Sequence, residues 1–293
     1  DGQVSSLPVV AYAVPTITSV RNLDGSVASS ASTDGGTWIR ISGTNFGPSI
    51  NCRNSTDGVV CGGFVQAVHY GPTGVSYAAP NYHVESDTSL RLKLAPGFGK
   101  GLHVTIQVAD QWSDMSVETF DFATPKVTAV SPGWGTAYVP LNTIITITVT
   151  GTNFALLDPS AEVGILFGNP LDATLRPILP VTSRLPSWDN AASLAGYTPG
   201  SAHKLTFSLP RGILVDRAVR VAVFFRGQSS GYRVVSDPLA DPTDAGWFSY
   251  NPPAISAVVV QTANTSDPAI YNFERNYWPG RSADFYNSLL LVR

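Results

Sequence analysis

The tetrapeptide Gly43-Thr44-Asn45-Phe46 decides the fold, because the chain repeats it as Gly151-Thr152-Asn153-Phe154. Each copy follows an alternating apolar stretch, residues 38–42 before the first and residues 145–150 before the second. Alternation with a two-residue period is typical of a strand with one buried face. Glycine and asparagine tolerate positive φ, and phenylalanine can fold back onto a core. Each copy therefore predicts a core strand followed by a turn.

A second pattern recurs three times and marks the boundaries of the repeated units. In its nine positions the first is aromatic, the fourth is proline, the sixth is β-branched, the eighth is small and the ninth is valine; the other positions vary. The three copies span residues 12–20, 122–130 and 250–258. Proline fixes φ and lacks a backbone donor, so it suits the junction between two folding units.

The two patterns together predict a tandem array of domains. We expect the end of a preceding unit over residues 1–14, a first domain over 15–124, and a second domain over 125–252. The second domain carries a long insertion over residues 169–201. Residues 253–293 start a third unit that is truncated, which would make the chain part of a longer protein.

The second half of each unit supplies further strand patterns. Residues 90–94 and 103–108 alternate in the first unit, and residues 205–209 and 219–223 alternate in the second. Turns about every ten residues between short alternating runs are typical of small antiparallel sandwiches. Helical periodicity is scarce, and one short helical turn is expected after Ser187. The predicted fold class is all-β, with tandem antiparallel β-sandwiches.

The composition excludes some classes of partner. Charged residues make up 13% of the 293 residues, below the roughly 25% of a typical soluble domain. The net charge of −3 offers no field that attracts nucleic acid or anionic lipid. The longest apolar runs are strand-length, so no transmembrane helix and no direct membrane insertion are expected.

The two cysteines, Cys52 and Cys61, flank a turn-rich loop. A disulfide closing this loop would contribute roughly 2–3 kcal/mol; two buried free thiols are the alternative. Asn54 in the same loop and Asn264 near the end of the chain begin N-glycosylation sequons. With the low charge, these features favour an oxidising, secretory compartment.

No combination of residues predicts a catalytic, cofactor or metal site. Residues 227–231 read Gly-Gln-Ser-Ser-Gly, the pattern of a hydrolase nucleophile elbow, but no histidine follows His203 and a strand pattern follows Ser229. A repeated hairpin turn explains this serine better. The four histidines lack zinc spacing. Three aspartates, at positions 110, 114 and 121, favour a solvated hairpin over a calcium site.

The chain resembles the IPT/TIG family of immunoglobulin-like domains. The resemblance is carried by Pro-x-Ile-x-Ser-Val at 15–20, by Ile-x-Ile-x-Gly-Thr-Asn-Phe-Gly at 39–47, and by the strand, Pro-Gly, strand and Gln-x-Ser section that ends at Ser113. The second unit departs from it, because Ala155 stands where the first has Gly47. The resemblance implies an immunoglobulin-like fold. It implies little about function, since the family includes spacers, binding modules and DNA-binding modules.

The leading hypothesis is an extracellular, non-enzymatic structural or adhesive protein. Its domains would build a surface filament, stalk or coat through contacts with copies of itself or with other filament subunits, and it would carry glycans but no cofactor. One alternative is a ligand-binding ectodomain that recognises a glycan or a protein through residues 169–201. The other is a non-catalytic accessory region of a secreted carbohydrate-active enzyme.

Overall fold

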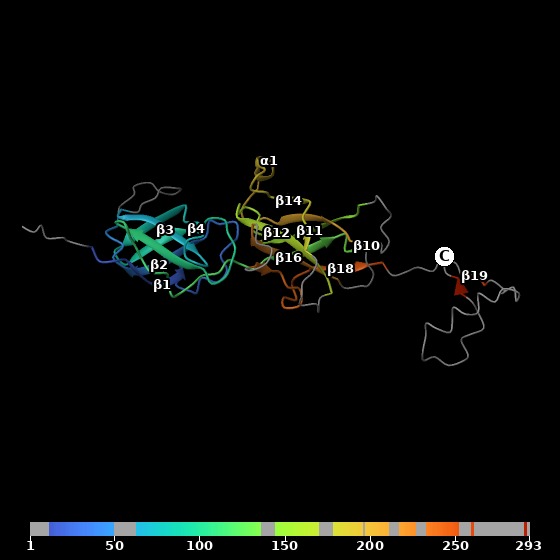
Figure 1. Ribbon diagram of the computed structural model, residues 1–293, viewed down its shortest axis with the longest axis horizontal. Helices are drawn as coiled ribbons and strands as arrows, with labels where there is room; N and C mark the ends of the chain where they lie inside the picture. The colour runs from blue at the N-terminus through green and yellow to red at the C-terminus, as the bar shows by residue number, and fades with distance from the viewer. Residues whose placement is uncertain are drawn as a thin grey trace, which may run out of the picture. The chain divides into compact units, whose positions relative to one another are not determined.

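The computed structural model describes residues 12–49, 63–135, 144–169, 178–195, 197–210, 217–226, 233–251, 259–260 and 290–291. The chain divides after Tyr250 into two units, and Figure 1 shows the strands of the first. The described part of the second unit is a pair of short antiparallel strands, β19 (Val259–Val260) and β20 (Leu290–Leu291). The remainder of the predicted third domain, residues 253–293, lies outside the described residues. The described elements are almost all strands, which confirms the all-β prediction.

The first unit begins with a sandwich of two four-stranded sheets. One sheet has the order β1-β2-β6-β5 and the other the order β4-β3-β7-β8. The strands are β1 (Thr16–Asn22), β2 (Trp38–Thr44), β3 (Val65–Gly71), β4 (Tyr77–Ala78), β5 (Asn81–Ser86), β6 (Ser89–Lys93), β7 (His103–Val108) and β8 (Gln111–Trp112). All pairings between these strands are antiparallel, as the alternating sequence patterns predict.

A second sandwich follows in the same unit. Its sheets have the orders β14-β15-β11-β9 and β10-β18-β16-β12-β13, with β17 also paired to β16. The strands are β9 (Lys126–Ser131), β10 (Trp134–Gly135), β11 (Thr146–Thr152), β12 (Ala161–Gly168), β13 (Ile178–Pro180), β14 (Ser183–Leu185), β15 (His203–Ser208), β16 (Arg217–Phe225), β17 (Arg233–Val235) and β18 (Trp247–Tyr250). The helix α1 (Ala191–Leu194) is a single turn after Ser187, as expected, and its N-cap is Asn190.

The two sandwiches share one strand order. The sheet β1-β2-β6-β5 corresponds to β9-β11-β15-β14, and β4-β3-β7 corresponds to β13-β12-β16. The parallel pairing of β10 with β18 has its counterpart in a single parallel bridge between Ala31 and Phe122. The internal repeat of the sequence is therefore a repeat of topology.

Each sandwich has its own hydrophobic core. In the first, Ile39, Ile41, Leu90 and Leu92 are fully buried between the sheets. In the second, a matching set is buried that includes Ile147, Val149, Leu205, Phe207, Val221 and Val223. The alternating residues that predicted the strands are the residues that fill the cores.

The asparagine and phenylalanine of the repeated tetrapeptide behave as the sequence predicts. Asn45 and Asn153 have φ values of 64° and 59°, in the left-handed region that asparagine tolerates. Phe46 and Phe154 are 0% exposed and lie in the two cores. The turn thus reverses the chain and places one large ring in the core of each sandwich.

The glycine of the tetrapeptide has a different role from the predicted one. Neither Gly43 nor Gly151 has a positive φ. A Cβ at Gly151 would overlap Lys126 O on the neighbouring strand and Cζ of Phe154, and a Cβ at Gly43 would overlap the equivalent atoms of Thr16 and Phe46. Glycine is required because the phenylalanine ring and the first strand both lie against this position.

The stretch 169–201 contributes strands as well as loop. Its described residues include β13, which pairs with β12, and β14, which pairs with β15, so the stretch passes from one sheet to the other. β4 and β5 do the same in the first sandwich. Among the described residues of this stretch, the segment around α1 has no counterpart strand in the first sandwich.

Candidate functional site

The two sandwiches meet at an aromatic contact. Phe225, at the end of β16, lies with its ring centroid 4.7 Å from that of Phe98 and 6.5 Å from that of Tyr77. Phe98 follows β6 in the first sandwich, yet it is buried among the core residues of the second. Phe225 also packs against the first core. The hydrophobic cores are therefore connected through these rings.

A hydrogen bond between buried side chains lies beside the aromatic contact. Tyr77 O–H donates to Asp158 Oδ2 (3.0 Å), and Ser160 donates to Asp158 Oδ1 through its amide (2.8 Å) and its hydroxyl (2.7 Å). Asp158 is 2% exposed. Burial raises the pKa of Asp158 above its ordinary value, although these hydrogen bonds act in the opposite direction. Burial and the nearby carboxylate also raise the pKa of Tyr77, which keeps its hydroxyl protonated as a donor.

The raised pKa of Asp158 gives a prediction for pH dependence. The folded protein binds a proton at Asp158 more tightly than the unfolded chain does. Ionised Asp158 therefore lowers stability, and this loss disappears as the pH falls through the raised pKa toward the ordinary value of 3.8. We expect the free energy of unfolding of Asp158→Asn, measured in urea and taken relative to wild type, to be higher at pH 7 than at pH 4. An unchanged difference between the two pH values would contradict the shift.

A second network joins the sandwiches through Asp34 and His203, which are buried, and Tyr197, which is half-buried. Phe154 N–H donates to His203 Nδ1 (3.1 Å), so Nδ1 carries no proton and Nε2 carries one. Nε2–H donates to Tyr197 Oη (2.8 Å), and Tyr197 O–H donates to Asp34 Oδ2 (2.8 Å). Gly200 N–H donates to the same oxygen (2.9 Å). Asp34 Oδ1 lies 2.9 Å from Nε2 without an aligned hydrogen bond. A neutral imidazole and a carboxylate are thus linked through one tyrosine.

The carboxylate of Asp34 is kept ionised within this network. Burial raises the pKa of Asp34, but the His203 ring beside it and the hydrogen bonds from Gly200 and Tyr197 outweigh burial and bring the pKa below its ordinary value. The side chains of His203 and Asp34 are 1% and 4% exposed. A substrate could reach neither, so the geometry favours holding the two sandwiches together over acid–base chemistry.

The repeated tetrapeptide is connected to the junction in its second copy. In the first sandwich the Phe46 amide donates to a backbone acceptor, Asp87 O (3.0 Å). In the second sandwich the equivalent amide of Phe154 donates to the His203 ring instead. The second turn therefore orients the histidine that binds the first sandwich.

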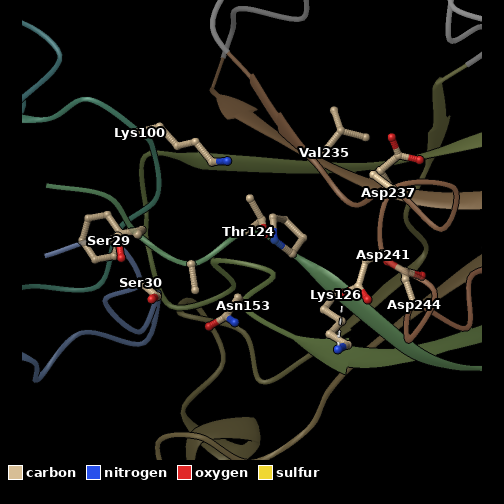
Figure 2. A pocket seen from close by; sticks show the side chains of 14 residues that line it. Ser29, Ser30, Lys100, Thr124, Lys126, Asn153, Val235, Asp237, Asp241 and Asp244 are labelled. Atoms are coloured by element: carbon tan, nitrogen blue, oxygen red, sulfur yellow. Dashed lines mark ion pairs between the residues drawn. The ribbon is translucent and has the colours of Figure 1, made fainter. Parts of the chain in front are cut away.

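A groove of about 550 Å³ lies beside the connection between the sandwiches. Figure 2 shows Thr124 near its middle, with Ser29 and Ser30 on one side and Lys126 beside Asp241 on the other. Lys126 Nζ lies 3.3 Å from Asp241 Oδ2. This ion pair holds the start of β9 to the loop before β18.

Asp244 strengthens the same connection. Its Oδ2 accepts from Val127 N–H (3.3 Å) and its Oδ1 accepts from Gly246 N–H (2.9 Å). Burial raises the pKa of this carboxyl group. The groove is polar. Asp241 binds Lys126 and Asp244 binds the amide of Val127, so both aspartates hold the start of β9, where the chain enters the second sandwich.

The residues singled out in the sequence are not brought together. Cys52, Cys61, Asn54, Asn264 and Ser229 lie outside the described residues, so the disulfide, the two sequons and the hairpin serine stay predictions. In the described ranges, no three His, Cys, Asp or Glu side chains are grouped to hold a metal ion, and no helix is long and apolar enough to span a membrane.

The aspartates and the strand-opening histidine have local roles. Asp110 Oδ1 accepts from Gln66 Nε2 (3.0 Å), and Asp121 Oδ1 accepts from Gly101 N–H (2.7 Å). The first contact lies at the turn between β7 and β8, and the second joins the segment before β7 to the segment before β9. His103, the first residue of β7, is half-buried, and its Nδ1 lies 2.6 Å from Ser116 O.

Sequence reasoning missed the three residues that form the junction network. Asp34 stands in the loop before β2, more than 160 positions from Tyr197 and His203, and neither pattern nor spacing relates residues so far apart. One signal was available. His203 occupies an inward position of an alternating strand whose other inward residues, Leu205 and Phe207, are apolar, and a buried histidine requires partners.

Comparisons with known proteins do not assign the chain to a family. No model of a known family matches the chain, and no curated protein matches it. Among solved structures, the chain is similar to the extracellular region of plexin A4, at 17% identity over 86% of this chain and 17% of that one, with a TM-score of 0.28.

Two further structures are similar at the same level. One is SGBP-B from a xyloglucan utilisation locus of Bacteroides uniformis, at 17% identity over 86% of this chain and 52% of that one, with a TM-score of 0.26. The other is the adhesin InvE of Yersinia pseudotuberculosis, at 11% identity over 84% of this chain and 66% of that one, with a TM-score of 0.29. The chain spans less than two thirds of each of the three. Because all three TM-scores are below 0.5, the fold class rests on the sheets of this chain.

Proposed function

We propose that the chain is a structural part of an extracellular surface protein, in which tandem immunoglobulin-like sandwiches of the IPT/TIG type form a stiff section of a filament, stalk or coat. The buried junction between the sandwiches carries this proposal. Its central feature is Asp34 of the first sandwich, whose carboxylate is bound by Tyr197 and Gly200 of the second.

The chemistry of the junction argues for stiffness. Relative motion is the usual expectation for neighbouring domains with ordinary polar interfaces. Here, separation would remove the donors from a buried carboxylate and expose the rings of Phe98 and Phe225. A buried charge without partners is costly, so few relative orientations of the sandwiches are compatible with this network.

The contacts of Tyr197 and Gly200 favour the structural hypothesis over ligand binding. Both residues belong to the stretch 169–201, through which the alternative hypothesis has the protein recognise a ligand. In the structure both bind the neighbouring sandwich. The extracellular location is supported by the low charge content, the two sequons and the close cysteine pair of the sequence.

Residual dipolar couplings of the full chain test the stiffness. We expect amides of the first sandwich and amides of the second to fit one alignment tensor, because a rigid junction makes them orient together. Tensors that differ in magnitude between the two sandwiches would show independent motion and would contradict the proposal.

Immunogold electron microscopy of the source cells tests the location. Antibodies raised against this chain should label a regular structure on the outside of the cell. Labelling confined to the interior would contradict the proposed function even if the junction is stiff.

A further inference from the structure

Basic side chains gather on the outer face of the sheet β1-β2-β6-β5 in the first sandwich. On these strands, the residues that alternate with the buried ones face away from the core. Four of them stand opposite one another across the four strands, in the order Arg21, Arg40, Arg91 and His83. Lys93 lies on the same face, two residues after Arg91 on β6. We call these five residues the basic face.

Two glutamates balance part of this charge. Glu85 lies 2.7 Å from Nε of Arg91 through Oε1 and 3.4 Å from Nε of Arg40 through Oε2. Glu118 pairs with Arg21 at the edge of the sheet. The lysine of the basic face makes no ion pair within the described part of the chain. Three arginines and one lysine therefore meet two carboxylates, and two positive charges remain in excess.

The arginines reach the solvent beyond their shared partner. The side chains of Arg40 and Arg91 are each 39% exposed, whereas that of Glu85 is 28% exposed. Glu85 contacts the Nε side of both guanidinium groups, so it does not occupy the terminal nitrogens of either one. The ring of Trp38 lies with its centroid 5.9 Å from Cζ of Arg91 and helps to fix this guanidinium group on the sheet.

The second sandwich carries no charge at the equivalent row. Its residues pair across the sheet as those of the basic face do, in the order Ser131, Thr148, Thr206 and Ser183. Thr148 corresponds to Arg40, because each stands three residues before the glycine of the repeated tetrapeptide. By the same register Ser208 corresponds to Lys93. The shared topology therefore forms without charges in this row.

The basic face lowers the stability of its sheet. Like charges that stand directly opposite each other on neighbouring strands are destabilising. Arg40 is opposite Arg21 on one side and opposite Arg91 on the other. Residues that break a local rule are expected at functional sites, where binding compensates for the lost stability. Since the fold forms without this charge in the second sandwich, the charge indicates a ligand.

The shape of the basic face fits a long anionic chain. Neighbouring strands lie about 4.8 Å apart, so the row of four side chains extends over about 15 Å. Guanidinium groups bind carboxylates and other oxyanions through two parallel hydrogen bonds. The central strands β2 and β6 are paired on both sides, so a peptide finds no free sheet edge there. Side-chain charges must therefore hold the ligand.

We propose that the basic face binds an acidic polysaccharide, whose carboxylate or sulfate groups pair with the guanidinium and ammonium groups of this face. A polymer that carries charge along its length can contact several strands at once, which a single small anion cannot do. The choice of a polysaccharide rests on the extracellular location in the proposed function, because acidic polysaccharides are exposed at cell surfaces and nucleic acids are kept inside.

Surface plasmon resonance with the full chain on immobilised heparin, a sulfated polysaccharide, tests the proposal. Binding by wild type should weaken as salt rises from about 50 mM to about 200 mM, because pairing of the charges releases counterions. The double substitution Arg40→Thr and Arg91→Thr removes the excess charge and introduces the residues of the second sandwich. It should weaken binding at least about tenfold.

A single substitution separates lost binding from lost folding. Lys93→Ser breaks no ion pair of the described residues and introduces the residue found at position 208. It should weaken binding and reduce the slope of the logarithm of the binding constant against the logarithm of the salt concentration by about one. Circular dichroism of each variant should match that of wild type.

Lys204→Ser is the matched control. It also removes one positive charge, from an exposed position of the second sandwich, and introduces the residue found at the equivalent position 89. The control should bind heparin like wild type. A wild-type chain that does not bind at low salt, or a control that loses as much binding as Lys93→Ser, would overturn the inference.

Two other polyanions test the choice of ligand. Polyglutamate and double-stranded DNA, added at the same concentration of charge, should compete with heparin less well than soluble heparin does. Equal competition by either one would overturn the assignment to a polysaccharide. Heparin binding by the purified chain is measured apart from the cell, so its failure is distinguishable from a failure of the extracellular location in immunogold microscopy.

Discussion

Replacing Gly151 with alanine should destabilise the second sandwich by about 3 kcal/mol, the upper part of the range for overpacked cores. The new Cβ would overlap Lys126 O on β9 and Cζ of the buried Phe154 ring. The ring is packed in the core of the second sandwich, where Phe154 is 0% exposed. The carbonyl cannot move without disturbing the pairing of β9 with β11, which already shifts register between Thr150 and Gly151.

Urea unfolding followed by tryptophan fluorescence and circular dichroism measures this effect. Gly133→Ala is the matched control in the same sandwich, because the nearest atom to its Cβ would be Val130 O at 3.6 Å. We expect the control to stay within about 0.5 kcal/mol of wild type. Gly43→Ala should reproduce the effect in the first sandwich, where Thr16 O and Phe46 occupy the same positions. A Gly151→Ala protein as stable as the control would show that the turn tolerates a side chain.

The repeated tetrapeptide also shows how much of the fold the sequence could predict. Alternation located strands such as β2, β7 and β11, because each has one buried face and the period of two is visible in the residues. The left-handed asparagines followed from residue type. The need for glycine at positions 43 and 151 did not follow from the sequence. It depends on how closely another strand and a phenylalanine ring approach the position, and the residue pattern within one strand reveals neither.

The junction was beyond sequence reasoning for a related reason. Proline and the aromatic repeat predicted where one unit follows the next, and these are local features. The contacts that join the sandwiches instead combine a loop before β2, the segment after α1 and the start of β15. Residues 169–201 were expected to form a long inserted loop, but β13 and β14 place part of this stretch in both sheets. Only the folded topology brings Tyr197 to Asp34.

Replacing Asp34 with alanine should cost about 3 kcal/mol and separate the unfolding of the two sandwiches. The substitution leaves Tyr197 O–H and Gly200 N–H without their acceptor and removes the carboxylate beside His203. A donor that loses its acceptor on burial costs about 1–3 kcal/mol, and the variant removes the acceptor of two part-buried donors. Differential scanning calorimetry should show one cooperative transition for the sandwiches of the wild-type chain and two for the variant.

The pH dependence identifies the carboxylate as the cause. Because the pKa of Asp34 is lowered on folding, its stabilisation is complete above the ordinary value of 3.8 and is lost as the pH falls through the lowered pKa. The difference between wild type and Asp34→Ala should therefore be constant near neutral pH and shrink in acid. Tyr197→Phe, which keeps the carboxylate and its bond from Gly200, should cost about 1 kcal/mol, and the exposed Asp114→Ala should leave a single transition. If Asp34→Ala unfolded in one transition at the wild-type midpoint, the sandwiches would be held by the Phe98–Phe225 contact without help from the buried network.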